Sequence, residues 1–232
     1  MKLINENQSN MSAVPEEQRE RINKILDFWY DGVTKNGAVE ENQIHKWCGH
    51  RGYGIDVDAL DEMLKNEFQQ DLENYVNGEY DSWNNDHEGV LAAIILTDQF
   101  TRNIYRHEAK AYASDHMALK LALNIVDRRC RLSEYKFWER TFILMPLIHA
   151  EHSVYTTKKA YSEIIALNSE MEDTGIEGLN CKMEDFRMHL VVIEKFGRYP
   201  HRNAVLGRES TAEEVEFLKT AETWGQGVCN KK

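Results

Sequence analysis

Three short segments of this chain concentrate side chains that can hold anions and transfer protons. They begin at Asp98, surround His149 and span residues 196–208. Arginine and asparagine bind carboxylates and phosphates, and a histidine beside a carboxylate can act as an acid or base. The candidate ligand-binding residues are Gln99, Arg102, Asn103, Arg106, Arg198, Arg202, Asn203 and Arg208. The candidate catalytic residues are Asp98, His149 and His201.

The third segment, Phe196 to Arg208, has the composition of a shaped polar loop. It places three arginines, a histidine and an asparagine among two glycines and one proline. Glycine and proline favour turns over a continuous helix. In one interpretation Arg202 and Arg208 clamp a carboxylate or phosphate while His201 donates or shuttles a proton. In the other, the guanidinium groups bond helix-end carbonyls and brace the loop.

The first segment continues a helix expected over residues 87–105. Residues 90–96 are apolar on nearly every side, which predicts an interior helix. The polar arc from Asp98 to Arg106 follows on the side of the buried stripe, and partly buried charges need partners. Asp98 and Arg102, four residues apart, therefore predict an ion pair. The arc either lines a ligand pocket or forms a buried ion-pair network that locks the helix.

The second segment raises the question of a metal. His149 and His152 follow Pro146, which is expected to kink or break its helix. Two imidazoles one turn apart on one helix face can share an ion, with His201 or Asp98 completing the site. The spacing differs from the metalloprotease motif, in which the histidines are four residues apart. A metal-dependent enzyme using His149 and His152 is one alternative, and no cofactor is predicted.

Composition limits the partners and the location. The net charge of −11 argues against a nucleic-acid surface, so any basic site must be local. No long apolar run and no secretory signal is present, so we expect a soluble, cytoplasmic protein without a membrane partner. The four cysteines, at 48, 130, 181 and 229, lack ordered spacing and predict reduced thiols. No P-loop, nucleophile elbow or dinucleotide fingerprint is present in the sequence.

The remaining pattern predicts an all-α protein, since only three prolines occur and no segment alternates as a strand does. The expected helices cover about residues 15–32, 56–75, 87–105, 115–130, 133–161, 183–196 and 210–224. Residues 1–14 and 227–232 are predicted to be disordered, around a single helical domain of residues 15–226. His189 is interpreted as a hydrogen-bonded histidine of the core.

Three ordered motifs resemble domain-of-unknown-function family 924. They are D-Q-F-x-R-N-I-Y-R from residue 98, M-P-L-x-H-x-E from residue 145, and F-G-R-Y-P-H-R-N-x-x-L-G-R from residue 196. The resemblance covers about residues 22–220 and implies one domain of antiparallel helical hairpins with tetratricopeptide-like packing. It implies no established reaction. The sequence departs from the family pattern at Thr101, where the family commonly has proline, and at Ala150, where it commonly has serine. Because alanine has no hydroxyl group, residue 150 cannot act through one.

Two functions of different classes follow. The first is binding of a small anionic metabolite in an Arg/His/Asn-lined pocket, with acid–base action on it if the protein is an enzyme. It predicts that the three segments converge on one cavity. The second is an interaction module whose concave helical surface binds a peptide or protein, with the motifs fixing the helical stack. The ligand, the oligomeric state and the choice between enzyme and binding protein stay open.

Overall fold

The computed structural model describes residues 13–33, 37, 39–40, 43, 46–47, 56–171, 179–221 and 223–226. Over these ranges the chain is helical, with one isolated antiparallel bridge between Val33 and Val39 and no strand. The expected all-α single domain is confirmed. The predicted disorder of residues 1–12 and 227–232 lies outside the described residues, as do the side chains of the four cysteines.

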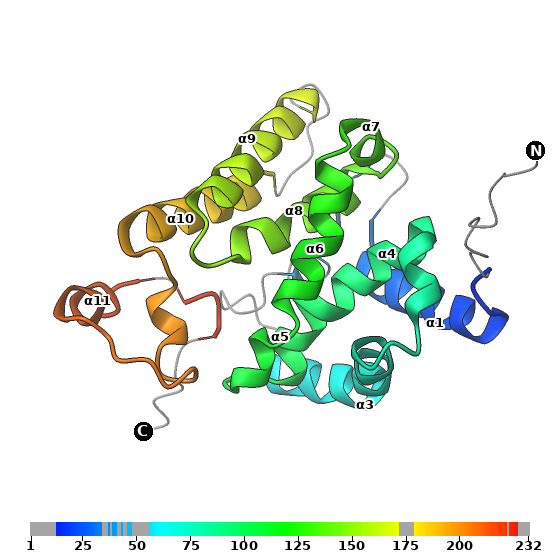
Figure 1. The fold of residues 1–232 in the computed structure, drawn as a ribbon, viewed down its shortest axis with the longest axis horizontal. Coiled ribbons are helices and arrows are strands. Elements are labelled where there is room, and N and C mark those ends of the chain that lie inside the picture. The colour runs from blue at the N-terminus through cyan, green and yellow to red at the C-terminus, as the bar shows by residue number, and fades with distance from the viewer. Residues whose placement is uncertain are drawn as a thin grey trace, which may run out of the picture.

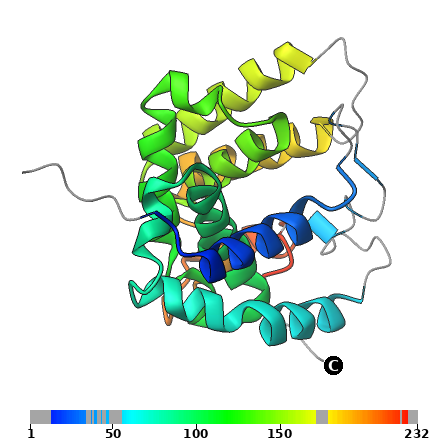
Figure 2. The same cartoon turned by 90° about the vertical axis from the view of Figure 1, so that its right-hand side faces the viewer.

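The helices form two groups around a central one (Figures 1 and 2). Their bounds are α1 (Glu16–Tyr30), α3 (Val57–Val76), η2 (Asp81–Asn85), α4 (His87–Ile94), η3 (Ile95–Phe100), α5 (Thr101–Ile104), η4 (Ala109–Tyr112), α6 (Asp115–Val126), α7 (Arg129–Leu132), α8 (Phe137–His149), α9 (Val154–Met171), α10 (Leu179–Phe196), η6 (Pro200–Arg202) and α11 (Ala212–Phe217). The central helix α4–η3–α5 packs against α1 and α3 on one side and against α6 and α8 on the other. Helices α8, α9 and α10 pack in succession beyond it.

The central helix is built as the sequence predicts for an interior element. Asp86 caps its start by accepting a hydrogen bond from the N–H of Gly89 at 2.8 Å. Gly89 is required because a Cβ there would lie 2.8 Å from the carbonyl oxygen of Trp83. Residues 90–96 are buried, which confirms the expected interior position.

One feature of the central helix was not predicted from the sequence. Residues 95–100 form the π-helical segment η3, in which each turn holds more residues than in an α-helix. Inserting about one residue rotates everything that follows by roughly 100° around the axis. The segment includes Asp98, which is fully buried. Segments of this kind are frequent at functional sites, so η3 directs attention to the polar arc.

The single helix expected over residues 133–161 is wrong, because the chain forms two helices there. Helix α8 runs through Pro146 and ends at His149, and α9 begins at Val154. Between them His152 adopts φ of 64° and donates its N–H to the carbonyl of Gly197 at 2.9 Å. The left-handed turn reverses the chain. His149 and His152 therefore do not share a helix face, and the geometric premise of the paired metal ligands is wrong.

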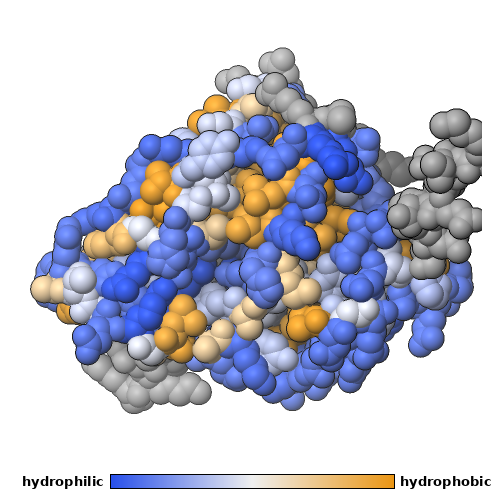
Figure 3. All heavy atoms as spheres, viewed as in Figure 1, coloured by the Kyte–Doolittle hydropathy of each residue, from blue (hydrophilic) through white to orange (hydrophobic). Residues whose placement is uncertain are grey.

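Aromatic side chains join the two groups of helices in one core. Trp29 of α1 meets Phe100 and Phe142 with ring centroids 5.5 and 5.2 Å apart, and Phe142 meets Trp47 at 4.9 Å. These rings are packed edge to face, the favourable arrangement for aromatic pairs. None of the described helices is both long and apolar enough to span a bilayer. Figure 3 shows a mainly hydrophilic face with hydrophobic side chains gathered near its centre.

Candidate functional site

A buried carboxylate and a histidine form the centre of the site. His149 Nδ1 lies 2.8 and 3.0 Å from the two carboxylate oxygens of Asp98, and Gln99 Nε2 also donates to Asp98. Burial raises the pKa of Asp98, although the charge of Arg102 opposes the shift. Burial lowers the pKa of His149 well below its usual value, and the charges of Arg102 and Arg202 lower it further. His149 is therefore neutral at pH 7.

Two arginines share a second carboxylate beside this pair. Arg102 lies 3.2 Å from Asp98, which confirms the predicted ion pair, and it also donates to Asp115 at 3.0 Å. Arg202 lies 3.3 Å from Asp115 and donates to the carbonyl of His149 at 3.2 Å. Burial raises the pKa of Asp115, although both arginines oppose the shift. Burial tends to lower the pKa of Arg102, but Asp115 and Asp98 together raise it.

The three sequence segments thus meet in one network. Asp98 and Arg102 come from the central helix, His149 from the end of α8, and Arg202 from the loop after α10. Arg202 also satisfies a helix-end carbonyl, as the bracing interpretation of the loop expects. Its guanidinium stacks between Tyr112 and Tyr199, 4.5 Å from each ring centroid.

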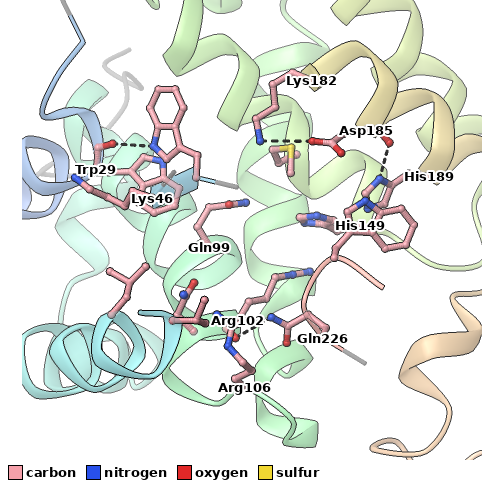
Figure 4. A pocket seen from close by; sticks show the side chains of 16 residues that line it. Trp29, Lys46, Gln99, Arg102, Arg106, His149, Lys182, Asp185, His189 and Gln226 are labelled. Atoms are coloured by element: carbon pink, nitrogen blue, oxygen red, sulfur yellow. Dashed lines mark hydrogen bonds and ion pairs between the residues drawn. The ribbon is translucent and has the colours of Figure 1, made fainter. Parts of the chain in front are cut away.

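A cavity of about 90 Å³ lies beside the network (Figure 4). Gln99, Arg102, His149 and Lys182 face a common space in this view, from three separate helices. Lys182 is only 6% exposed, and its Nζ lies 3.7 Å from Asp185, which is beyond hydrogen-bond distance. Within the described residues, no acceptor forms a hydrogen bond with Lys182 Nζ.

Apolar and aromatic side chains form much of the rest of the wall. They are Trp29, Trp47, Val57, Leu60, Met145 and Trp224. Trp29 Nε1 is buried and has no hydrogen-bond acceptor in the described part of the chain. A buried donor without a partner is uncommon and calls for an explanation, such as a bound ligand or water.

The last described residues, 223–226, line one side of the cavity and are called the strap. The Trp224 ring lies 3.9 Å from the His189 ring, and Arg106 donates to the carbonyl of Gly225 at 3.0 Å. Gln226 Nε2 donates to a backbone carbonyl of α5 at 3.1 Å. The last helix, α11, ends at Phe217, so the expectation of a helix up to about residue 224 is wrong. The strap instead forms part of the cavity wall.

Three predicted ligand-binding residues lie away from the cavity wall and hold the loop. Arg208 forms two hydrogen bonds to Glu151, at 2.7 and 3.0 Å. Arg198 binds both oxygens of Glu214, at 2.7 and 2.8 Å, and Asn203 donates to the same carboxylate at 3.3 Å. The hydrogen bond from Arg198 is the main reason that the pKa of Glu214 falls to about 2. These contacts favour the bracing interpretation for these three residues.

The other predicted residues divide between the wall and its surroundings. Arg106 and Asn103 line the cavity, and both bind Asp61 of α3. His201 is buried behind the wall, with its ring 5.3 Å from that of Trp224. His152 is exposed. Within the described ranges, no three histidine, cysteine or acidic side chains are grouped as metal ligands.

Sequence reasoning missed Lys182 and the tryptophans, and it placed His189 in the core only. His189 is indeed buried and hydrogen-bonded, since its Nδ1 lies 2.7 Å from the carbonyl of Asp185, but it also lines the cavity. The sequence signal for its burial was its position among apolar residues on one face of α10, and nothing in that pattern indicated a cavity. Lys182 precedes His189 by seven residues, or about two turns, and so lies on the same face of α10, but no motif marks it.

The comparisons with known proteins agree with the motif resemblance. The profile of the family described as bacterial protein of unknown function (DUF924) matches residues 25–222. A solved structure of the protein of unknown function ATU0120 from Agrobacterium tumefaciens is 28% identical, with a TM-score of 0.66. The match covers 87% of this chain and 98% of that chain. Among curated proteins, none matches this chain.

Proposed function

The chain belongs to the DUF924 family of bacterial proteins of unknown function, and we propose that it binds a small organic anion in the cavity beside His149. The observation that carries the proposal is the buried ammonium group of Lys182, which faces the cavity: it pairs with Asp185 at 3.7 Å but has no hydrogen-bonded acceptor among the described residues. A buried ammonium group needs hydrogen-bond acceptors as well as a neighbouring charge, because the loss of hydration is otherwise only partly compensated. A carboxylate bound in the cavity would supply such an acceptor.

The charges on and directly behind the wall support an anionic ligand. The cations are Lys46, Arg102, Arg106, Lys182 and Arg202, and the carboxylates near them are Asp31, Asp61, Asp98, Asp115 and Asp185. Among the described residues that line the cavity itself, four are cations and one, Asp185, is a carboxylate. The neighbouring histidines are neutral. The cavity wall is thus richer in cations than in carboxylates, in contrast to the net charge of −11 of the chain.

The size and the wall chemistry indicate a short carboxylic acid. The volume of about 90 Å³ is well below the roughly 300–1,000 Å³ of pockets for drug-sized ligands. The apolar wall, with Trp29, Leu60 and Met145, provides contacts for a short carbon chain. A cation beside an apolar wall suits a carboxylate with a small apolar substituent better than inorganic phosphate.

Direct binding measurements test the proposal. We expect acetate, lactate or pyruvate to raise the melting temperature, and a ligand at about 100 times its Kd should add roughly 2.7 kcal/mol of stability. Inorganic phosphate and sulfate serve as comparators. Lys182→Met keeps the length of the side chain but removes the charge, and should weaken binding at least about tenfold, or about 1.4 kcal/mol.

Lys158→Met is the matched control. Lys158 lies on the neighbouring helix α9, is 57% exposed and pairs with Glu194, so its replacement should leave the affinity unchanged. The proposal fails if none of the carboxylates binds, or if Lys182→Met binds them as well as the wild type does.

The alternative of an interaction module stays a prediction. The large apolar side chains that are exposed in the described part of the chain are Met63, Val76, Tyr155, Ile165, Val191 and Val215. They are distributed over α3, α9, α10 and α11. We therefore base the proposed function on the cavity.

A further inference from the structure

We propose that the cavity is a catalytic site in which His149 Nε2 removes a proton from a bound short-chain 2-oxo acid. The inference rests on the proposed anion binding and assigns it a substrate class and a reaction. Three observations lead to it: the hydrogen bonds around Asp98, the position of His149 Nε2, and two of the cations on the wall, Arg102 and Lys182.

The hydrogen bonds around Asp98 determine which nitrogen of His149 carries the proton. Asp98 is approached by His149 Nδ1, Gln99 Nε2 and the guanidinium of Arg102. The side-chain amide nitrogen of Gln99 and the guanidinium of Arg102 can only donate hydrogen bonds, not accept them. If Asp98 were protonated, the one neighbour that could accept its hydrogen would be the ring nitrogen of His149. If Asp98 is ionised, its oxygens can accept hydrogen bonds from all three neighbours. The arrangement therefore favours the ionised form of Asp98 with the hydrogen on Nδ1 of the histidine.

The other ring nitrogen of His149 is then a base. In the neutral ring with hydrogen on Nδ1, Nε2 carries a lone pair. His149 lines the cavity, and no described residue forms a hydrogen bond with its Nε2. A carboxylate that fixes the tautomer and orientation of an imidazole is the arrangement by which histidine acts as a general base. A histidine with only a structural role would be expected to use both nitrogens.

Two cations reach the same space from different helices. Arg102 lies on α5 and Lys182 on α10, and both line the cavity with His149. A simple carboxylate needs one cation, but a 2-oxo acid has a second acceptor in its carbonyl oxygen. A planar guanidinium suits the carboxylate, and an ammonium group suits the single carbonyl oxygen. The pair therefore fits a 2-oxo acid, whose carbonyl also makes the neighbouring C–H bond acidic.

The proposed step is an enolisation without a net change in oxidation state. The C–H bond at C3 breaks, its proton moves to His149 Nε2, and its electron pair forms the C2–C3 double bond. The carbonyl electrons move onto the oxygen at C2, where the ammonium of Lys182 stabilises the negative charge. Return of a proton from His149 to C3 restores the 2-oxo acid. In heavy water the proton exchanges with solvent deuterium between the two steps.

Proton NMR in heavy water tests the inference with pyruvate and 2-oxobutyrate as probes. The wild type should exchange the C3 protons faster than buffer alone, and His149→Gln should lower the rate at least about a hundredfold while the ligand still binds. His201→Gln is the matched comparison, because His201 is also buried and near the network but lies outside the wall. It should keep the exchange.

The outcomes separate the two proposals. Binding of a 2-oxo acid without accelerated exchange refutes the catalytic inference and leaves the binding function standing. If acetate or lactate binds but no 2-oxo acid does, only the catalytic inference is refuted, whereas absence of binding by every carboxylate tested refutes both. Loss of exchange in His201→Gln but not in His149→Gln overturns the assignment of the base. Nitrogen NMR of the wild type needs no substitution: we expect Nε2 of His149 to be unprotonated at pH 7, and a hydrogen on Nε2 would overturn the inference even if His149→Gln does not fold.

Discussion

Replacing Glu214 by glutamine tests whether charge holds the loop that carries Arg202. Glu214 is only 2% exposed and accepts hydrogen bonds from Arg198, Asn203 and the N–H of Thr211. The last bond is half of the capping box of α11, in which Thr211 in turn accepts a hydrogen bond from the N–H of Glu214. Glutamine preserves the shape but turns one acceptor oxygen into a donor that faces the Arg198 guanidinium.

The size of the effect follows from the pKa of Glu214, which falls from 4.5 to about 2. A shift of this size corresponds to at most about 3.4 kcal/mol, since each unit represents about 1.36 kcal/mol. Arg198 is a quarter exposed, so solvent screens the pair, and we expect Glu214→Gln to cost about 1–2 kcal/mol at pH 7. Because the folded pKa is depressed, this stabilisation is present above pH 4.5 and is lost as the pH falls toward 2.

Urea unfolding at several pH values measures the effect. The difference between the wild type and Glu214→Gln should be constant from pH 7 to about 5.5 and fall by roughly 40% by pH 3.5. Glu213→Gln is the matched control, because Glu213 is the neighbouring residue, is 67% exposed and should cost less than about 0.5 kcal/mol. A difference below about 0.3 kcal/mol at pH 7, or one that does not change with pH, would refute the reasoning.

Three further predictions concern the core and the site. Gly89→Ala places a Cβ within 2.9 Å of backbone atoms of η2 and should destabilise the protein by about 1–3 kcal/mol in urea unfolding; an unchanged midpoint contradicts this. Burial lowers the pKa of His149, His189 and His201, so the unfolded chain binds more protons below pH 6.5. The free energy of unfolding should therefore decrease as the pH is lowered, by up to about 1.4 kcal/mol per pH unit for each histidine. A free energy of unfolding that does not change between pH 7 and 5.5 contradicts this. Trp224→Ala removes the ring that packs on His189 and should weaken pyruvate binding in calorimetry; an unchanged affinity would show that the strap plays no part in the site.

The parts of the fold that could be predicted are those set by local sequence. The apolar run of residues 90–96 predicted an interior helix, and the four-residue spacing of Asp98 and Arg102 predicted their ion pair. Both depend only on helix periodicity. Asp56 caps α3 by accepting a hydrogen bond from the N–H of Ala59, at the place where the sequence predicted a helix to begin.

The parts that could not be predicted depend on geometry beyond one helix. His152 adopts a left-handed turn although it is not a glycine, so no residue type marks the break between α8 and α9. The π-helical segment has no composition of its own, because Ile95 to Phe100 reads like ordinary helix. Lys182 joins the cavity only through the packing of α10 against α8 and α9, which a single sequence does not show.

The distribution of carboxylates explains why the arginines of one motif divide between bracing and the site. Arg198 and Arg208 each bind both oxygens of one acidic partner, Glu214 and Glu151, so these two charges are balanced locally and hold the loop. Arg102 and Arg202 instead share Asp115, and the other nearby carboxylate, Asp98, also serves His149. The two guanidinium groups next to His149 therefore depend on carboxylates that they share, and a bound anion in the neighbouring cavity would further reduce the cost of burying them.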